Sequence, residues 1–119
     1  MSSADTKQLI TRSVERLQRE VPALGKLKLV VRVELPARGG DAPIWRVQLP
    51  ELTVNRHPAG DARLDVIVTR QHFNDLADEG SLRDWARAYD RGHVKVSGDA
   101  AVVKLLGNVI ERQLARTSN

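Results

Sequence analysis

Residues 92–113 read GHVKVSGDAAVVKLLGNVIERQ, in which a short alternating pattern passes through Gly-Asp into a helical pattern. Val94 and Val96 alternate with polar residues, so residues 93–97 predict a β-strand with one buried face. The apolar residues after Asp99 recur at helical spacing, which predicts a helix that runs to about Arg116. An acid at the start of this helix suits the positive end of the helix dipole. The stretch therefore predicts a strand that leads directly into a long helix.

A phosphate-binding loop of the G-x-x-x-x-G-K-[ST] type does not fit this junction. Five residues separate Gly92 from Gly98, but they have the pattern of a strand and not of a loop. Asp99 also stands where a phosphate would need a cation. The junction is therefore interpreted as the end of a strand followed by a helix cap.

The apolar side chains of the last helix cover about half of its circumference, whereas a helix lying on a sheet needs only about 100°. Fully exposing two of them would forgo roughly 3–6 kcal/mol of burial free energy. Neighbouring helices, a second subunit or an apolar ligand could cover them, and the pattern leaves all three open. The apolar residues are Val102, Val103, Leu105, Leu106, Val109, Ile110 and Leu114.

Three further helices are predicted from capping residues and helical spacing. Asp5 begins an amphipathic helix that ends at Pro22. Thr69 and Ser81 are suited to cap two short helices, which Gly80 separates.

The other segments show strand alternation at residues 26–35, 44–49, 52–54 and 64–69. With residues 93–97 they make five strands, the first two of which suggest a hairpin. We expect an α+β fold, in which helices pack on one face of a five-stranded, mostly antiparallel sheet.

The open face of that sheet is predicted to be basic, because strict alternation of the first two strands leaves four cations outside. This favours a second hypothesis, binding to an anionic partner such as a membrane surface or an acceptor protein. Nucleic acid is disfavoured, because Trp45 points inward with Val47 and no aromatic ring falls on the basic face. The four cations are Lys26, Lys28, Arg32 and Arg46.

Length and composition indicate one domain over residues 1–119, with 41% hydrophobic and 29% charged residues. The chain lacks cysteine, which excludes disulfides and thiolate sites. The first residues, MSSADTKQ, carry no signal-peptide core. We expect a cytoplasmic protein.

The sequence does not single out a catalytic or metal site. His72, Asp75 and Glu79 could share a helical face as metal ligands, but Gly80 ends that helix, so a solvated polar face is favoured. No G-x-S-x-G elbow marks a nucleophile. We expect no enzymatic activity and no cofactor.

The C-terminal half resembles the sterol carrier protein type two family, also described as nonspecific lipid-transfer domains. The matching segments span about residues 44–112. They are WRVQL, LDVIVT, QHFNDLADEG and GHVKVSGDAAVVKLL, which is similar to that family's strand, Gly-Asp and helix signature.

This resemblance implies an apolar tunnel between sheet and helices that holds a fatty acid, an acyl-CoA or a sterol-like lipid without chemistry. An accessory or homodimerisation module without a lipid cavity remains the alternative. The expected tunnel lining is Phe73, Leu76, Leu82, Trp85, Tyr89, Val102, Leu105, Leu106 and Val109.

Overall fold

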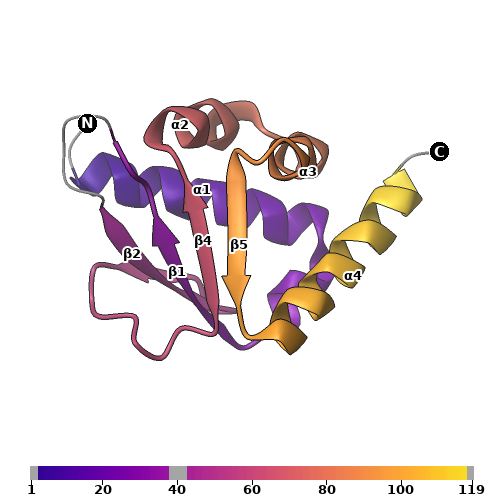
Figure 1. The fold of residues 1–119 in the computed structure, drawn as a ribbon, viewed down its shortest axis with the longest axis horizontal. Helices are drawn as coiled ribbons and strands as arrows, with labels where there is room; N and C mark the ends of the chain where they lie inside the picture. The colour runs from indigo at the N-terminus through magenta and orange to yellow at the C-terminus, as the bar shows by residue number, and fades with distance from the viewer. Residues whose placement is uncertain (1–2, 38–42, 118–119) are drawn as a thin grey trace.

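The computed structural model describes the backbone of residues 3–37 and 43–117, and the side chains of residues 5–37, 43–77 and 80–116. Over these residues the chain forms the predicted α+β fold (Figure 1). In chain order the elements are α1 (Ser3–Glu20), the 3-10 turn η1 (Pro22–Lys26), β1 (Leu29–Glu34), β2 (Ile44–Leu49), β3 (Thr53–Asn55), β4 (Leu64–Val68), α2 (Arg70–Glu79), α3 (Leu82–Asp90), β5 (Val94–Gly98) and α4 (Ala100–Thr117).

The five strands form one sheet in the order β3-β2-β1-β4-β5. β1 and β2 form the predicted antiparallel hairpin, and β2–β3 and β4–β5 are antiparallel as well. β1 and β4 are parallel, so the sheet is mixed. The prediction of a mostly antiparallel sheet is confirmed.

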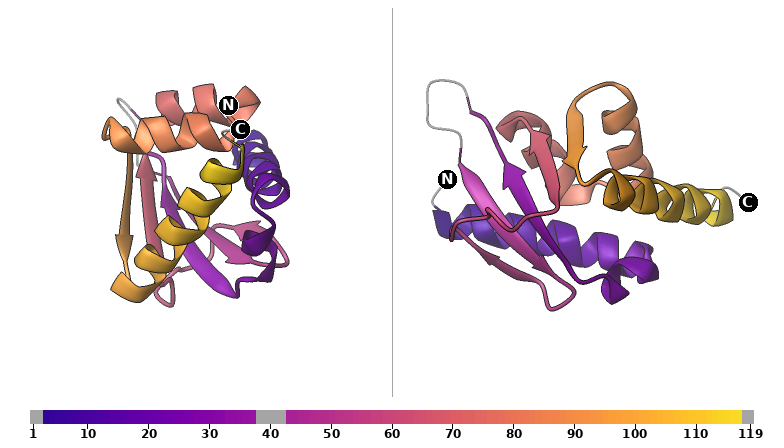
Figure 2. Two further views of the ribbon diagram at one scale, coloured as in Figure 1. Left: turned by 90° about the vertical axis from the view of Figure 1, so that its right-hand side faces the viewer. Right: turned by 60° about the horizontal axis from the view of Figure 1, so that its bottom comes forward.

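The helices lie around one face and one end of this sheet (Figures 1 and 2). α1 runs across the face of β1 and β2, and α2 and α3 lie at the end where β5 begins. α4 starts at the opposite end of β5 and runs outward past the edge of the sheet. The helix-covered face is called the inner face below.

The inner face is apolar because its residues follow the strand register. Val31 pairs with Val47 and with Leu64, so these side chains share one face across three strands. All three are buried, as is Trp45 with 3% of its surface exposed. Ile10 of α1 packs against them, and this contact between α1 and the sheet is the centre of the core.

The first strand is shorter than its alternation predicts. Residues 22–26 form the 3-10 turn, and Leu27 is the first residue after it with an extended backbone. β1 therefore begins at Leu29, and the prediction of a strand from Lys26 is wrong. Pro22 favours this outcome, because its fixed φ suits the first position of a helical turn.

Both predicted N-caps are confirmed. The Thr69 side chain accepts a hydrogen bond from the backbone N–H of His72, at 3.3 Å. The Ser81 hydroxyl accepts from the N–H of Asp84, and the Asp84 carboxylate accepts from the N–H of Ser81. This reciprocal capping box satisfies two backbone donors at the start of α3.

The Gly98–Asp99 junction fixes where α4 begins. Gly98 has φ +128°, which disfavours any residue with a side chain. A Cβ at this position would lie 2.5 Å from the carbonyl oxygen of Arg63. Asp99 accepts from the backbone N–H of Ala101 at 2.9 Å, and its other carboxylate oxygen pairs with Arg63 at 3.0 Å. The junction is thus a close strand approach followed by a helix cap, in agreement with the interpretation from the sequence.

Substituting Gly98→Ala should lower the free energy of unfolding by about 2 kcal/mol or more, because it combines an unfavourable φ with a backbone clash. Gly107→Ala is the control: Gly107 lies within α4, and a Cβ there meets no atom within 4 Å. This control should be neutral or stabilising by up to about 1 kcal/mol. Urea unfolding measures both, and equal stability of the two variants would contradict the role given to Gly98.

Candidate functional site

The apolar face of α4 is turned toward the rest of the molecule but is not sealed. Its side chains are partly buried, and none falls in the buried class. Leu105, at the margin of this face, is 47% exposed. By contrast, buried side chains occur on α1, α2 and α3. The partly buried apolar members of the face are Val102, Val103, Leu106, Val109, Ile110 and Leu114.

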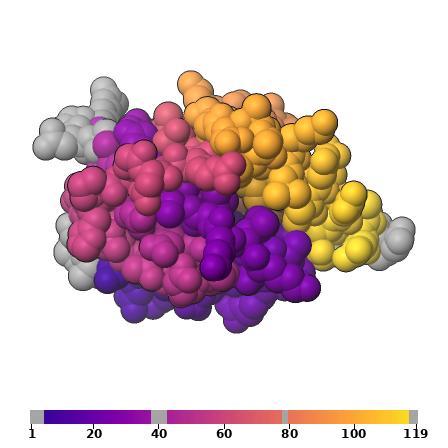
Figure 3. Space-filling view, turned by 90° about the horizontal axis from the view of Figure 1, so that it is seen from below, coloured from indigo at the N-terminus to yellow at the C-terminus, as the bar shows by residue number. Residues whose placement is uncertain are grey.

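The two halves of α4 differ in their packing. Val102, Val103 and Leu106 in the first half pack against the buried core. Val109 and Ile110 in the second half are not among the side chains that pack against it. Figures 1 and 3 show this part of α4 projecting at one end of the molecule. The apolar face therefore continues beyond the core that supports it.

Opposite α4, the inner face of β4 and β5 is also incompletely covered. Val66 and Val96 are register partners on this face, and both are only partly buried. Trp85 of α3 is partly buried as well, and its ring meets Phe73 of α2 edge-on, with 6.4 Å between centroids. These side chains and those in the first half of α4 are all partly buried and all pack against the buried core, and they are called the α4 seam below. Its members are Val66, Val96, Trp85, Val102, Val103 and Leu106.

The residues expected to line a tunnel fall into three groups. Phe73 and Leu82 are buried. Tyr89 and Leu105 are exposed, by 52% and 47%. The remaining five are partly buried and include members of the α4 seam: Leu76, Trp85, Val102, Leu106 and Val109.

Sequence reasoning missed the two sheet residues of the seam. Val66 and Val96 each occupy the middle inward position of a strand whose alternation was recognised. Alternation places a side chain on a face but does not say how completely that face is covered. Their partial exposure depends on the direction of α4, which only the structure shows.

The four cations of the second hypothesis do not form one free basic surface. Lys26 lies in η1 and Lys28 precedes β1, so neither belongs to the strand.

Arg32 and Arg46 are register partners on the outer face. Arg32 pairs with Glu34 at 2.9 Å and with Asp65 at 3.7 Å. Arg46 pairs with Asp61 at 2.7 Å. These carboxylates offset the positive charges of Arg32 and Arg46.

A wide depression of about 500 Å³ adjoins the outer face. Arg32 and Ile44 line it from the sheet, and residues 56–60 line it from the β3–β4 connection. The outer face is therefore partly covered by this connection and is not wholly solvated.

The histidine on α2 has structural partners. His72 Nδ1 lies 2.8 Å from the Thr69 hydroxyl, and its ring stacks on His93 with 4.0 Å between centroids. No group of three or more potential metal-ligating side chains occurs among the described residues. The contacts of His72 thus connect α2 to the start of β5.

Comparison with solved structures shows what this architecture is. Palmitated SCP2L2 from Aedes aegypti superposes with a TM-score of 0.58 at 22% sequence identity, covering 83% of this chain and 91% of that one. The chain has the sterol carrier protein type two fold. Sterol carrier protein 2 from Yarrowia lipolytica, in its apo form, has the same fold, with a TM-score of 0.52 at 20% identity over 77% of this chain and 78% of that one.

A further structure with the sterol carrier protein type two fold, the ubiquinone synthesis protein UbiJ-SCP2, matches over 91% of this chain and 98% of its own, with a TM-score of 0.51 and 25% identity. The resemblance predicted from residues 44–112 is thus confirmed at the level of the fold. The sequence itself matches no family model and no curated protein.

Across the described residues, every helix is too short or too polar to cross a membrane.

Asp84 and Asp99, the acids that cap α3 and α4, both have lowered pKa values. Hydrogen bonds from Ser81 chiefly lower the pKa of Asp84, and Arg87 and Arg16 add weaker Coulombic effects. The hydrogen bond from Arg63 chiefly lowers the pKa of Asp99, with the backbone N–H groups of Val102 and Ala101 contributing next. A carboxyl with a lowered folded-state pKa stabilises the fold above its ordinary pKa and loses this contribution as pH falls through its folded-state pKa.

Asp99→Asn should therefore make the free energy of unfolding less dependent on pH below about 4, which is near the ordinary pKa of aspartate. Asparagine retains the helix cap but cannot titrate. The measurement is the urea midpoint of wild type and variant between about pH 2 and pH 6. Asp75→Asn, the same substitution at an exposed position on α2, is the control, and the pH slope should change more in Asp99→Asn than in this control. Identical pH slopes for wild type and Asp99→Asn would contradict the assignment.

Proposed function

We propose that this chain binds the apolar part of a lipid in the α4 seam and carries it without chemical change. The observation that supports this proposal is the incompletely buried apolar face of α4, opposed by partly buried Val66, Val96 and Trp85. A side chain that is only partly covered gains free energy when an apolar ligand removes its remaining surface from water, at about 25 cal/mol per Å².

The candidate ligands share a long apolar body. A fatty acid, an acyl-CoA or a sterol-like lipid would place that body against α4 and the inner face of β4 and β5. Any polar headgroup would remain in water, since the seam offers it few polar partners. Among proteins of the same fold, one is described as palmitated and another as a ubiquinone synthesis protein. Both descriptions support a lipid-related role for this chain.

Binding would require no catalytic group. The seam consists of aliphatic side chains and the Trp85 ring, so it offers shape and exclusion of water but no nucleophile. We propose that this role is exercised in the cytoplasm, alone or together with an acceptor membrane or protein.

A charge placed on the apolar face of α4 should abolish binding. Leu106→Lys should weaken binding of a pyrene-labelled fatty acid at least tenfold, because a bound chain would desolvate the ammonium group. Asn108→Lys adds the same charge on the exposed polar side of the same helix and should change binding less than twofold. Pyrene fluorescence measures both affinities.

Val109→Lys provides a second test if Leu106→Lys unfolds, because Val109 is not among the side chains that pack against the core. Far-UV circular dichroism establishes that each variant is folded. Absence of probe binding by the wild-type protein at micromolar concentration would refute the proposal, as would equal losses in Leu106→Lys and Asn108→Lys.

A further inference from the structure

A groove of about 210 Å³ lies between α1 and α2, away from the α4 seam. Three arginines of α1 line this groove. They are spaced four and three residues apart, so they lie on one face of α1. Leu9 and Ala77 complete the lining on the apolar side, and Glu15 is the one acid among the lining residues. The three arginines are Arg12, Arg16 and Arg19.

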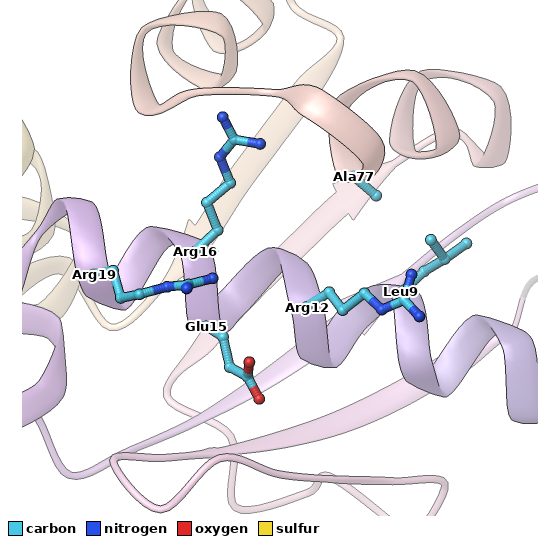
Figure 4. A pocket seen from close by; sticks show the side chains of 6 residues that line it. All are labelled: Leu9, Arg12, Glu15, Arg16, Arg19 and Ala77. Atoms are coloured by element: carbon cyan, nitrogen blue, oxygen red, sulfur yellow. The ribbon is translucent and has the colours of Figure 1, made fainter.

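Arg16 and Glu15 are neighbours in the chain but point to different sides of α1. In Figure 4, Arg16 points from α1 toward the ribbon of α2 and α3, whereas Glu15 points to the opposite side. Among the described residues, Arg12, Arg16 and Arg19 form no ion pair and no side-chain hydrogen bond. Arg16 also has a weak Coulombic effect on Asp84, whose pKa is lowered chiefly by hydrogen bonds from Ser81.

Like charges at these spacings destabilise a helix. Three arginines elsewhere in the chain do form ion pairs: Arg46 with Asp61, Arg63 with Asp99 and Arg32 with two carboxylates. The groove arginines lack such partners among the described residues. An anion bound between them would relieve this repulsion.

We propose that the α1–α2 groove binds a phosphate group, as a phosphomonoester or a diphosphate, through Arg12, Arg16 and Arg19. Three guanidinium groups and one carboxylate give the lining a net charge of +2. A phosphomonoester carries a charge of about −1.5 to −2 at pH 7, which matches this value. Guanidinium forks also bind phosphate oxygens in pairs, with directed, charge-assisted hydrogen bonds.

The size of the groove agrees with this ligand class. Pockets for drug-sized molecules occupy roughly 300–1,000 Å³, so a groove of about 210 Å³ suits a headgroup better than a whole metabolite. The rest of the ligand would extend outward over the helices. The groove shares no residue with the α4 seam, and this proposal stands independently of lipid binding there.

Calorimetric titration with inorganic pyrophosphate tests the site, at a constant ionic strength of about 0.15 M so that general screening does not change. Arg16→Gln should weaken binding about tenfold, the effect of losing one hydrogen-bonded charge. Arg112→Gln removes the same charge from an exposed position on α4 and should change affinity less than twofold.

Glu15→Gln gives an effect of opposite sign. Removing the only acid of the lining should strengthen pyrophosphate binding two- to fivefold, which general damage to α1 would not do. The proposal is overturned if wild type does not bind pyrophosphate at millimolar concentration. It is also overturned if Arg16→Gln and Arg112→Gln lose affinity equally, since the anion would then be responding only to total charge.

The source of the phosphate is distinguished by competition. Vesicles of phosphatidylcholine containing phosphatidic acid present the phosphomonoester on a lipid surface. If they displace pyrophosphate from wild type, the ligand is a lipid headgroup. The other result is that the vesicles bind wild type no more tightly than they bind Arg16→Gln, while pyrophosphate still binds wild type. In that case the ligand is a phosphate ester in solution. Each result supports the groove as a phosphate site.

Discussion

The direction of α4 depends on the close approach of β5 to β4 at Gly98. Gly98 is the register partner of Leu64, and the two backbones meet so closely that no side chain fits at Gly98. The positive φ of Gly98 turns the chain, and Asp99 then begins α4 by accepting from its first N–H groups and pairing with Arg63. α4 therefore starts at a fixed point, and its later turns extend beyond the sheet. The partial burial of its apolar face follows from this geometry.

The other helices are held differently. Arg70 of α2 donates to the Thr6 hydroxyl of α1 at 2.7 Å, and Glu20 at the end of α1 accepts from the N–H of Leu82 in α3 at 2.9 Å. These bonds join α1, α2 and α3 to one another over the sheet. Buried Ile10 and Phe73 add apolar contacts to the same core. The fold thus combines a well-packed framework with one helix whose apolar face is less completely covered, and binding sites are commonly found in such less stable parts.

Much of this arrangement could be predicted from the sequence, because it follows from local rules. Alternation located all five strands, Thr69 and Ser81 marked two helix starts, and Gly98-Asp99 was recognised as a strand end and cap. The predicted start of β1 was wrong because residues 22–26 form a 3-10 turn after Val21, although Lys26 and Lys28 continue the strand alternation. The width of the apolar arc on α4 correctly indicated a surface that its own chain does not fully cover.

Non-local features could not be predicted in the same way. The pairing of Arg46 with Asp61 depends on how residues 56–63 return to the sheet, so the outer face looked more basic in the sequence than it is. The groove arginines follow a helical period, but their role depends on the position of α2 over α1. Exposure of Tyr89 and Leu105 likewise depends on where α3 and α4 lie, and no spacing rule reports it.

The central claim is that a ligand completes the burial of α4. Amide hydrogen exchange of α4, measured by mass spectrometry with and without palmitate, tests it most directly. Residues 102–110 should exchange readily in the lipid-free protein and become at least tenfold slower with palmitate, while α1 stays unchanged. Slow exchange without lipid, or protection that rises only with protein concentration, would contradict the account, because the face would then be covered by the chain itself or by a second copy.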